Sequence, residues 1–290
     1  MEFWQSLAVT EMDQLIALAR FAEELGFAGV TVSDHLVKPR RIESLYPYTP
    51  DGKPFWDAED PFPDPWVLIG AMARETTRIR FMPFVYVLPL RDPFSVAKAV
   101  STAALLSKDR VVLGVGVGWM QEEFTLTGQA FARRGRRADE MLEVIAKLMT
   151  GESVEHRGEC YDFDAVQMAP APDRRIEIRV GGHGNASFRR AARNDGWLGL
   201  QQSPDALEGI VARLREEQKR AGREGRTLDV MISHYPSTPD SGEYERYRDA
   251  GATSVNVPPW SYRGVDAPNL DDKRRSLEEF AERYIVPLGG

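Results

Sequence analysis

Short runs of β-branched and other apolar residues alternate along the chain with stretches in which apolar residues recur every three or four positions. The first pair consists of a strand at 3–9 and an amphipathic helix that ends at Gly26. Further strands are predicted at 28–32, 79–87, 111–117, 176–180, 196–200, 229–233 and 254–257, with helices between them. About eight strands alternating with about eight helices predict an α/β fold, an eight-stranded parallel β/α (TIM) barrel formed as one domain by residues 1–290. A doubly wound open sheet is the alternative architecture at this length.

Two stretches interrupt the alternation and are predicted to be insertions. Residues 40–65 contain too much proline for a helix and too many aromatic side chains for a solvated linker. Because this stretch follows the second strand, we expect it to lie over the mouth of the barrel as a lid; a loop packed on the outside is the alternative. Residues 151–175 are predicted to form a small hairpin and a proline-rich connection.

Composition narrows the possible partners. The 290 residues carry a formal net charge of −7, which argues against nucleic acid or an anionic membrane as a partner. Cys160 is the only cysteine, so no internal disulfide can form and a reducing compartment fits. The sequence has no secretory signal at its start and no apolar run approaching the ~20 residues that span a bilayer. We therefore expect a soluble, cytoplasmic protein.

Residues 111–119, which contain the fourth predicted strand, place three glycines two positions apart, at Gly114, Gly116 and Gly118. Side chains alternate across a strand, so the glycines leave one face bare, on which a flat molecule could lie. Glycines in a strand can equally permit a bend or a close strand crossing.

The second strand ends in Ser33-Asp34-His35, which places a carboxylate and an imidazole where the chain leaves the sheet. Histidine exchanges protons near neutral pH, and Asp34 could orient or charge it. Alternatively, Asp34 caps the next segment and His35 is a surface residue. The other three histidines are scattered without the spacing of metal ligands, so no metal site is predicted.

The fifth strand leads through Val180-Gly181-Gly182-His183-Gly184-Asn185 into a helix. Backbone N–H groups of such a loop can converge on an anion at the positive end of the helix dipole, which predicts a phosphate site. Two glycines before a helix are also a common turn. The stretch is not a P-loop, and the glycines at 114–118 do not have the dinucleotide-binding spacing.

In their order, these motifs resemble the luciferase-like monooxygenase superfamily, and most closely its coenzyme F-420 (deazaflavin)-dependent oxidoreductases. The resemblance rests on the segments at 32–36, 76–80, 87–93, 110–124, 181–183 and 195–197. It implies a β/α barrel that binds the cofactor ring at its carboxyl-end mouth, and a homodimer. By the same resemblance His35 is the active-site histidine and Asp34 its neighbour. The implied cofactor-binding residues are Phe84, Val85 and Tyr86, at a bulge that often holds a non-proline cis peptide, with Gly116, Gly118, Gly181, Gly182 and Asn185.

One position departs from the family's pattern. Relatives that oxidise sugar phosphates have a glutamate where this chain has Trp119. An apolar or aromatic substrate that stacks on Trp119, in a pocket with Tyr46 and Trp56, is therefore expected.

The resemblance implies hydride transfer between reduced coenzyme F-420 and a small organic, apolar substrate, with His35 handling the accompanying proton. An FMN-dependent monooxygenase that activates oxygen is one alternative, and a flavin-binding protein without catalysis is another. A barrel enzyme that acts on a phosphorylated substrate without a redox cofactor is a third.

Overall fold

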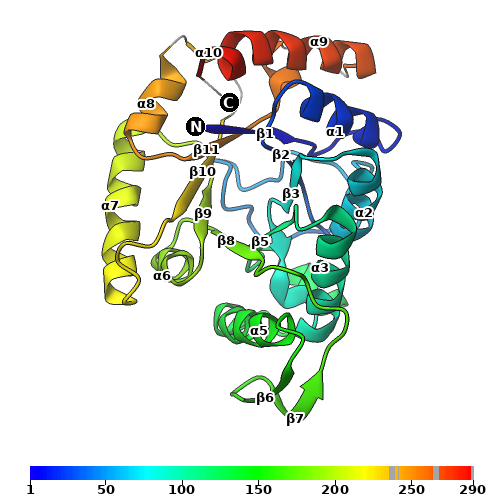
Figure 1. Cartoon of the computed structure of the whole chain (residues 1–290), viewed down its shortest axis with the longest axis vertical. Coiled ribbons are helices and arrows are strands. Elements are labelled where there is room, and N and C mark those ends of the chain that lie inside the picture. Colours follow the sequence, from blue (N-terminus) through cyan, green and yellow to red (C-terminus); the bar gives the residue numbers. More distant parts are fainter. Residues whose placement is uncertain (235–238, 241, 264–267, 289–290) are drawn as a thin grey trace.

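The chain forms a parallel β/α barrel, seen along its axis in the computed structural model (Figure 1). The structure describes residues 1–234, 239–240, 242–263 and 268–288. The barrel strands are β1 (Glu2–Ser6), β2 (Gly29–Val32), β3 (Arg80–Pro83), β4 (Tyr86–Val87), β5 (Val112–Gly116), β8 (Glu177–Gly181), β9 (Gly196–Gly199), β10 (Asp229–Ser233) and β11 (Ser254–Val257). The α-helices are α1 (Leu15–Glu24), α2 (Pro65–Glu75), α3 (Pro93–Ser107), α4 (Gln121–Leu126), α5 (Arg134–Leu148), α6 (Asn185–Arg193), α7 (Pro204–Arg220), α8 (Glu243–Asp249), α9 (Leu270–Phe280) and α10 (Val286–Leu288). Shorter turns are the 3-10 helices η1 (Leu88–Leu90) and η2 (Pro259–Arg263) and the π-helix η3 (Ala281–Ile285).

The strands run in the order β3-β2-β1-β11-β10-β9-β8-β5-β4, and every pair is parallel. A parallel bridge joins Phe81 of β3, at one end of this order, to Val111, which directly precedes β5 near the other end. The Phe81 N–H donates to the Arg110 carbonyl at 2.9 Å. The sheet thereby nearly closes, and the predicted barrel is confirmed in place of an open sheet.

The third predicted strand, 79–87, is divided in two. Its halves β3 and β4 are separated by the Phe84–Val85 peptide bond, which is cis. β3 pairs with β2, whereas β4 pairs with β5. This division turns eight predicted strands into nine observed ones.

The inside of the barrel is filled by side chains rather than open. Trp4, Met82, Val112, Leu198 and Met231 form a buried cluster within it. Gly29 makes room for the indole, because a Cβ at this position would lie 2.3 Å from Trp4 Cε3. The amino ends of the strands are thus closed by packing.

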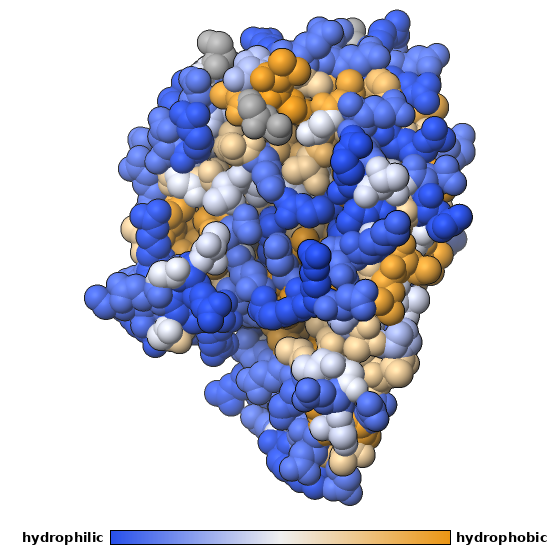
Figure 2. Space-filling model, viewed as in Figure 1, coloured by the Kyte–Doolittle hydropathy of each residue, from blue (hydrophilic) through white to orange (hydrophobic). Residues whose placement is uncertain are grey.

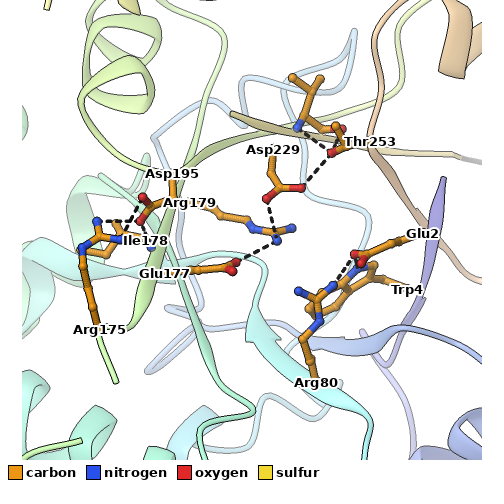
Figure 3. Close-up of polar contacts among 11 residues, drawn as sticks. Glu2, Trp4, Arg80, Arg175, Glu177, Ile178, Arg179, Asp195, Asp229 and Thr253 are labelled. Atoms are coloured by element: carbon orange, nitrogen blue, oxygen red, sulfur yellow. Dashed lines mark hydrogen bonds and ion pairs between the residues drawn. The ribbon is translucent and has the colours of Figure 1, made fainter. Parts of the chain in front are cut away.

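Charged side chains cover this closed end (Figure 3). The Arg179 guanidinium pairs with Glu177 at 3.0 Å and with Asp229 at 3.1 Å, and Arg80 pairs with Glu2. Figure 2 shows hydrophilic residues gathered over the middle of the same face. In a barrel of this type the amino-end face serves stability, and the chemistry takes place at the opposite end.

The two remaining strands form the predicted hairpin. β6 (Ser153–Arg157) pairs antiparallel with β7 (Asp162–Gln167), and in Figure 1 the pair projects beyond α5. Helix α4 was not predicted, because its six residues are too few for a helical periodicity. Within the described residues, no helix is long and apolar enough to cross a membrane.

Candidate active site at the carboxyl ends of the strands

His35 lies just beyond β2 and is held by a carboxylate from α4. Its Nδ1 is 3.0 Å from Oε2 of Glu123, and the two side chains are only 11% and 2% exposed. The other oxygen of Glu123 accepts from the Leu36 N–H at 2.5 Å and, more weakly, from the Val37 N–H at 3.4 Å. His35 is therefore not the freely exposed residue that one interpretation of the sequence allowed.

Asp34 has different partners from those predicted. Its carboxylate forms a bidentate pair with the Arg91 guanidinium at 2.6 and 2.8 Å and accepts from the Val87 N–H at 2.8 Å. Both oxygens are engaged in this way, and the carboxylate that holds His35 is that of Glu123. The prediction that Asp34 orients His35 is therefore corrected. Asp34 holds β4 and the turn after it through the Val87 N–H and Arg91. The Arg91 guanidinium supplies the opposite charge that a buried carboxylate needs.

The glycines of β5 do not leave a bare surface. A Cβ at Gly114 would lie 2.2 Å from the Pro83 carbonyl oxygen, and one at Gly116 would lie 2.5 Å from Val85 Cγ2. Gly118, just beyond β5, has φ +76°, and a Cβ there would lie 2.7 Å from Val87 Cγ1 and 2.8 Å from Phe124 Cε2. The first interpretation, an open face for a flat molecule, is therefore wrong at these atoms: the glycines admit side chains and backbone from the third strand.

Val85 is the residue that the glycines accommodate. Its methyl groups also lie 2.8 Å from where a Cβ of Gly181 would be, so Val85 rests between β5 and β8. Phe84 and Val85 are half-buried and pack on the cluster inside the barrel. Tyr86 behaves differently, since its ring packs against Trp66 at 5.5 Å and under Arg91, and burial raises its pKa to about 12. Of the three, Phe84 and Val85 belong to the barrel interior, whereas Tyr86 belongs to the core beneath the helices.

Aromatic side chains surround His35. We call residues 40–65 the aromatic segment; Figure 1 shows it in light blue behind the ring of strands. From it, Trp56 approaches the His35 ring to 5.1 Å and Phe62 to 5.3 Å between centroids. Tyr46 lies 5.1 Å from both Trp56 and Trp119. The three predicted pocket residues thus form one cluster with His35.

The aromatic segment is fastened to α4 and reaches β8. Glu122 accepts from the Glu43 and Ser44 N–H groups at 2.6 and 3.0 Å. Tyr48 makes an edge contact with His183 at 5.8 Å. The segment therefore extends across strand ends that are far apart in sequence.

The glycine loop after β8 leads into α6 as predicted. Gly182 has φ +123°, which favours glycine, and Gly184 is the N-cap of α6 without a side-chain cap. Asn185 is the exposed first residue of the helix. His183 accepts the Leu200 N–H at its Nε2 (3.1 Å), and burial lowers its pKa. The neutral His183 ring thereby links the loop to Leu200.

The sequence interpretation missed Glu123 and Arg91. A signal for Glu123 was present, because two glutamates follow the fourth predicted strand at the end where Asp34 and His35 emerge. The sequence around Arg91 contained no signal of a functional role, since a single arginine before Asp-Pro is ordinary for a helix start. In the part of the chain that the structure describes, no group of three or more His, Cys, Asp or Glu side chains could hold a metal ion.

His35 and the aromatic cluster lie at the carboxyl ends of the barrel strands. Enzymes with a β/α barrel fold have their active sites at this face. Comparison with known proteins gives the family: the luciferase-like monooxygenase family profile matches residues 3–283. The chain belongs to this family and is an oxidoreductase.

Two relatives illustrate the range of similarity. An uncharacterized protein of Mycobacterium tuberculosis is 40% identical over 99% of this chain and 100% of its own length. An F420-dependent glucose-6-phosphate dehydrogenase of Nakamurella multipartita is 30% identical over 94% of this chain and 78% of its own length.

Solved structures agree on the fold. An F420-dependent secondary alcohol dehydrogenase superposes with a TM-score of 0.78 at 16% identity over 98% of both chains. A type II Baeyer-Villiger monooxygenase of Pseudomonas putida, solved with FMN, superposes with a TM-score of 0.63 at 19% identity over 99% of this chain and 75% of its own. Proteins that share this fold thus include one solved with an F420 adduct and one solved with FMN.

Proposed function

We propose that this oxidoreductase transfers hydride between coenzyme F-420 and a small, apolar organic substrate at the carboxyl-end mouth of the barrel. The observation that carries the proposal is the position of His35, which is held by Glu123 and enclosed by aromatic rings. Two relatives that are 30% and 28% identical to this chain are named as F420-dependent dehydrogenases, which favours deazaflavin over flavin as the cofactor.

The loop before α6 fits a phosphate-bearing cofactor. The helix has no acidic residue in its first turn and no side chain capping its start. A Cβ added to Gly184 would meet nothing within 4 Å, so the approach to the helix N-terminus is open. The helix start and its dipole favour an anion here, and we assign phosphate binding to Gly181, Gly182 and Asn185.

Phe84 and Val85 are proposed to support the ring of the cofactor, with Gly116 and Gly118 behind them. The glycines act indirectly, because they let Val85 and Val87 pack closely against β5 and the turn after it. When bound, the cofactor supplies the carbon that accepts or donates hydride. The chain's own task is to position the reactants and to exclude water.

His35 is proposed to hold or release the proton that accompanies hydride transfer. Its Nδ1 is engaged by Glu123, which leaves Nε2 as the nitrogen that can exchange a proton. Such acid/base assistance contributes about a hundredfold or more to turnover.

The substrate pocket is proposed to consist of Trp119, Tyr46 and Trp56. These rings present large apolar surfaces with polar tips, which suit an apolar or aromatic substrate. Because Trp119 offers no carboxylate, oxidation of a sugar phosphate, the activity for which the Nakamurella relative is named, is not proposed here. We further propose that the aromatic segment is a lid, that the protein is a homodimer, and that it works in the cytoplasm.

FMN-dependent monooxygenation is the second candidate function. It is favoured by the structural likeness to the FMN-bound Baeyer-Villiger enzyme. Reduced FMN can activate oxygen, whereas a deazaflavin carries hydride, so the identity of the cofactor decides the reaction class.

Paired titrations test the proposal. The purified protein is titrated with coenzyme F-420 and with FMN in the same buffer, and binding is followed by the absorbance and fluorescence of each cofactor. We expect tighter binding of the deazaflavin. Tighter binding of FMN would overturn this preference in favour of the second candidate, and binding of neither would overturn both.

A further inference from the structure

We infer that Glu123 is the positioning residue of this site: it fixes the tautomer of His35, so that Nδ1 carries the hydrogen and Nε2 faces the reaction. This inference rests on the proposed acid/base role of His35. Glu123 lies on α4, a helix that the sequence periodicity did not predict.

The hydrogen bonds define the tautomer. A carboxylate only accepts, so the 3.0 Å contact between Glu123 Oε2 and Nδ1 requires a hydrogen on the nitrogen. In the neutral ring the lone pair is then on Nε2, which can take up a proton. If the Glu123 carboxylate were removed, this preference for a hydrogen on Nδ1 would be lost.

The same carboxylate also holds the backbone that carries the histidine. Its Oε1 accepts from the Leu36 N–H at 2.5 Å, directly after His35 in the chain. Trp56, whose ring is tilted by 32° to the imidazole, and Phe62, at 80°, restrict the imidazole further. Because Glu123 is almost fully buried, water competes little for either oxygen.

Glu122 provides a matched control. It is the neighbouring residue on α4, and it also binds backbone N–H groups that lead into the aromatic segment, those of Glu43 and Ser44. The carboxylate in contact with His35 is that of Glu123. A Glu122→Gln variant therefore perturbs the segment and leaves the tautomer partner in place.

The test is nuclear magnetic resonance of the cofactor-free protein, in which the ring nitrogens of His35 report the tautomer directly. We expect the Nδ1–H form in the wild type and in Glu122→Gln. In Glu123→Gln we expect a mixture with the Nε2–H form, because an amide can donate as well as accept. Turnover of Glu123→Gln should fall about tenfold or more through kcat, with KM nearly unchanged and with an altered pH profile.

The wild-type spectrum alone can overturn the inference, since a neutral His35 in the Nε2–H form contradicts it without any variant. An unchanged tautomer in folded Glu123→Gln would overturn it as well. If Glu123→Gln does not fold, Glu123→Asp replaces it: the carboxylate is kept but drawn back by one methylene, and an unchanged single tautomer together with full kcat would contradict the inference. A shifted tautomer with undiminished kcat would instead contradict the proposed role of His35, so the two failures are distinguishable.

Discussion

At the scale of single residues, the site depends on which carboxylate meets which partner. Two acids, Asp34 and Glu123, lie near the end of β2, but Asp34 is neutralised by Arg91 and Glu123 engages His35. Sequence adjacency favoured the wrong acid. The side chain next to His35 in the chain leaves the strand in another direction, whereas the residue 88 positions away reaches the ring.

The role of His35 gives the first residue-scale prediction. His35→Ala should lower kcat about a hundredfold while cofactor affinity changes little, because a proton-transfer group is lost and the phosphate loop is intact. Steady-state kinetics and a cofactor titration measure both quantities. His156→Ala is the control, since it removes another buried histidine that pairs with a glutamate: His156 lies on β6 of the hairpin and Glu140 on α5. Equal turnover of His35→Ala and the wild type would refute the assignment.

At the scale of elements, most boundaries followed from hydrophobic periodicity, and the failures have physical causes. The strand predicted at 79–87 continues as an apolar run, yet the chain is interrupted at Phe84–Val85. Periodicity records which residues are buried and not whether the backbone stays extended. The glycines of β5 predict either an open face or a close crossing, and local sequence does not decide between them. The structure shows the close approach, because side chains from β3 and the segment after it fill this face.

The contact between Glu23 of α1 and the loop from α2 to β3 gives a pH-dependent prediction. Glu23 is desolvated, which raises its pKa, but its hydrogen bonds from the Thr77 and Arg78 N–H groups outweigh this and hold the pKa below its usual value. Because the folded pKa lies below the unfolded one, this stabilisation is complete above the unfolded pKa and is lost as the pH falls through the folded pKa.

Glu23→Gln should therefore lower the free energy of unfolding by about 1–3 kcal/mol at pH 7. Urea unfolding at pH 7 and at successively lower pH should show the gap to the wild type narrowing as Glu23 becomes protonated. The exposed neighbour Glu24, changed to Gln, serves as the control. A gap that stays constant down to the lowest pH at which the protein folds would contradict this account.

The start of α6 gives a prediction in which stability and binding move in opposite directions. Gly184→Asp supplies a better N-cap and should stabilise the protein by about 0.3 kcal/mol, because glycine is itself a tolerated N-cap residue. The added carboxylate should also repel and displace a phosphate, which lowers cofactor affinity by about tenfold or more. Thermal unfolding and titration measure the two effects, with Gly209→Asp on α7 as the charge-matched control. Undiminished binding to Gly184→Asp would remove α6 from the proposed site.

At the scale of the whole molecule, the barrel separates stability from chemistry. Its amino end is closed by Trp4 and the ion pairs of Arg179, whereas its carboxyl end carries His35, the aromatic cluster and the glycine loop. The barrel and the convergence of strand-end residues were predictable, because parallel strands bring their carboxyl ends to one face. The contacts between those residues were not, since they depend on side-chain directions set by tertiary packing.

Two glycine variants test this separation. Gly29→Ala should destabilise the protein by about 1–3 kcal/mol, the cost of overpacking a core, because its Cβ would collide with Trp4. Gly209 is an exposed residue of α7, and a Cβ added there would meet nothing within 4 Å. Gly209→Ala should therefore stabilise the protein by about 0.5–1 kcal/mol. Cofactor affinity should be unchanged in both folded variants. A selective loss of affinity in folded Gly29→Ala would show that the closed end takes part in binding.

The most direct test of the central claim is a crystal structure of the protein with coenzyme F-420. The account predicts the ring at the carboxyl-end mouth, against Val85 and within reach of His35 Nε2, with a phosphate at the start of α6. A groove of about 550 Å³ lies elsewhere, lined by residues of α5, Ile176 and the start of β8. Cofactor bound in that groove, or at the mouth but out of reach of His35, would contradict the account.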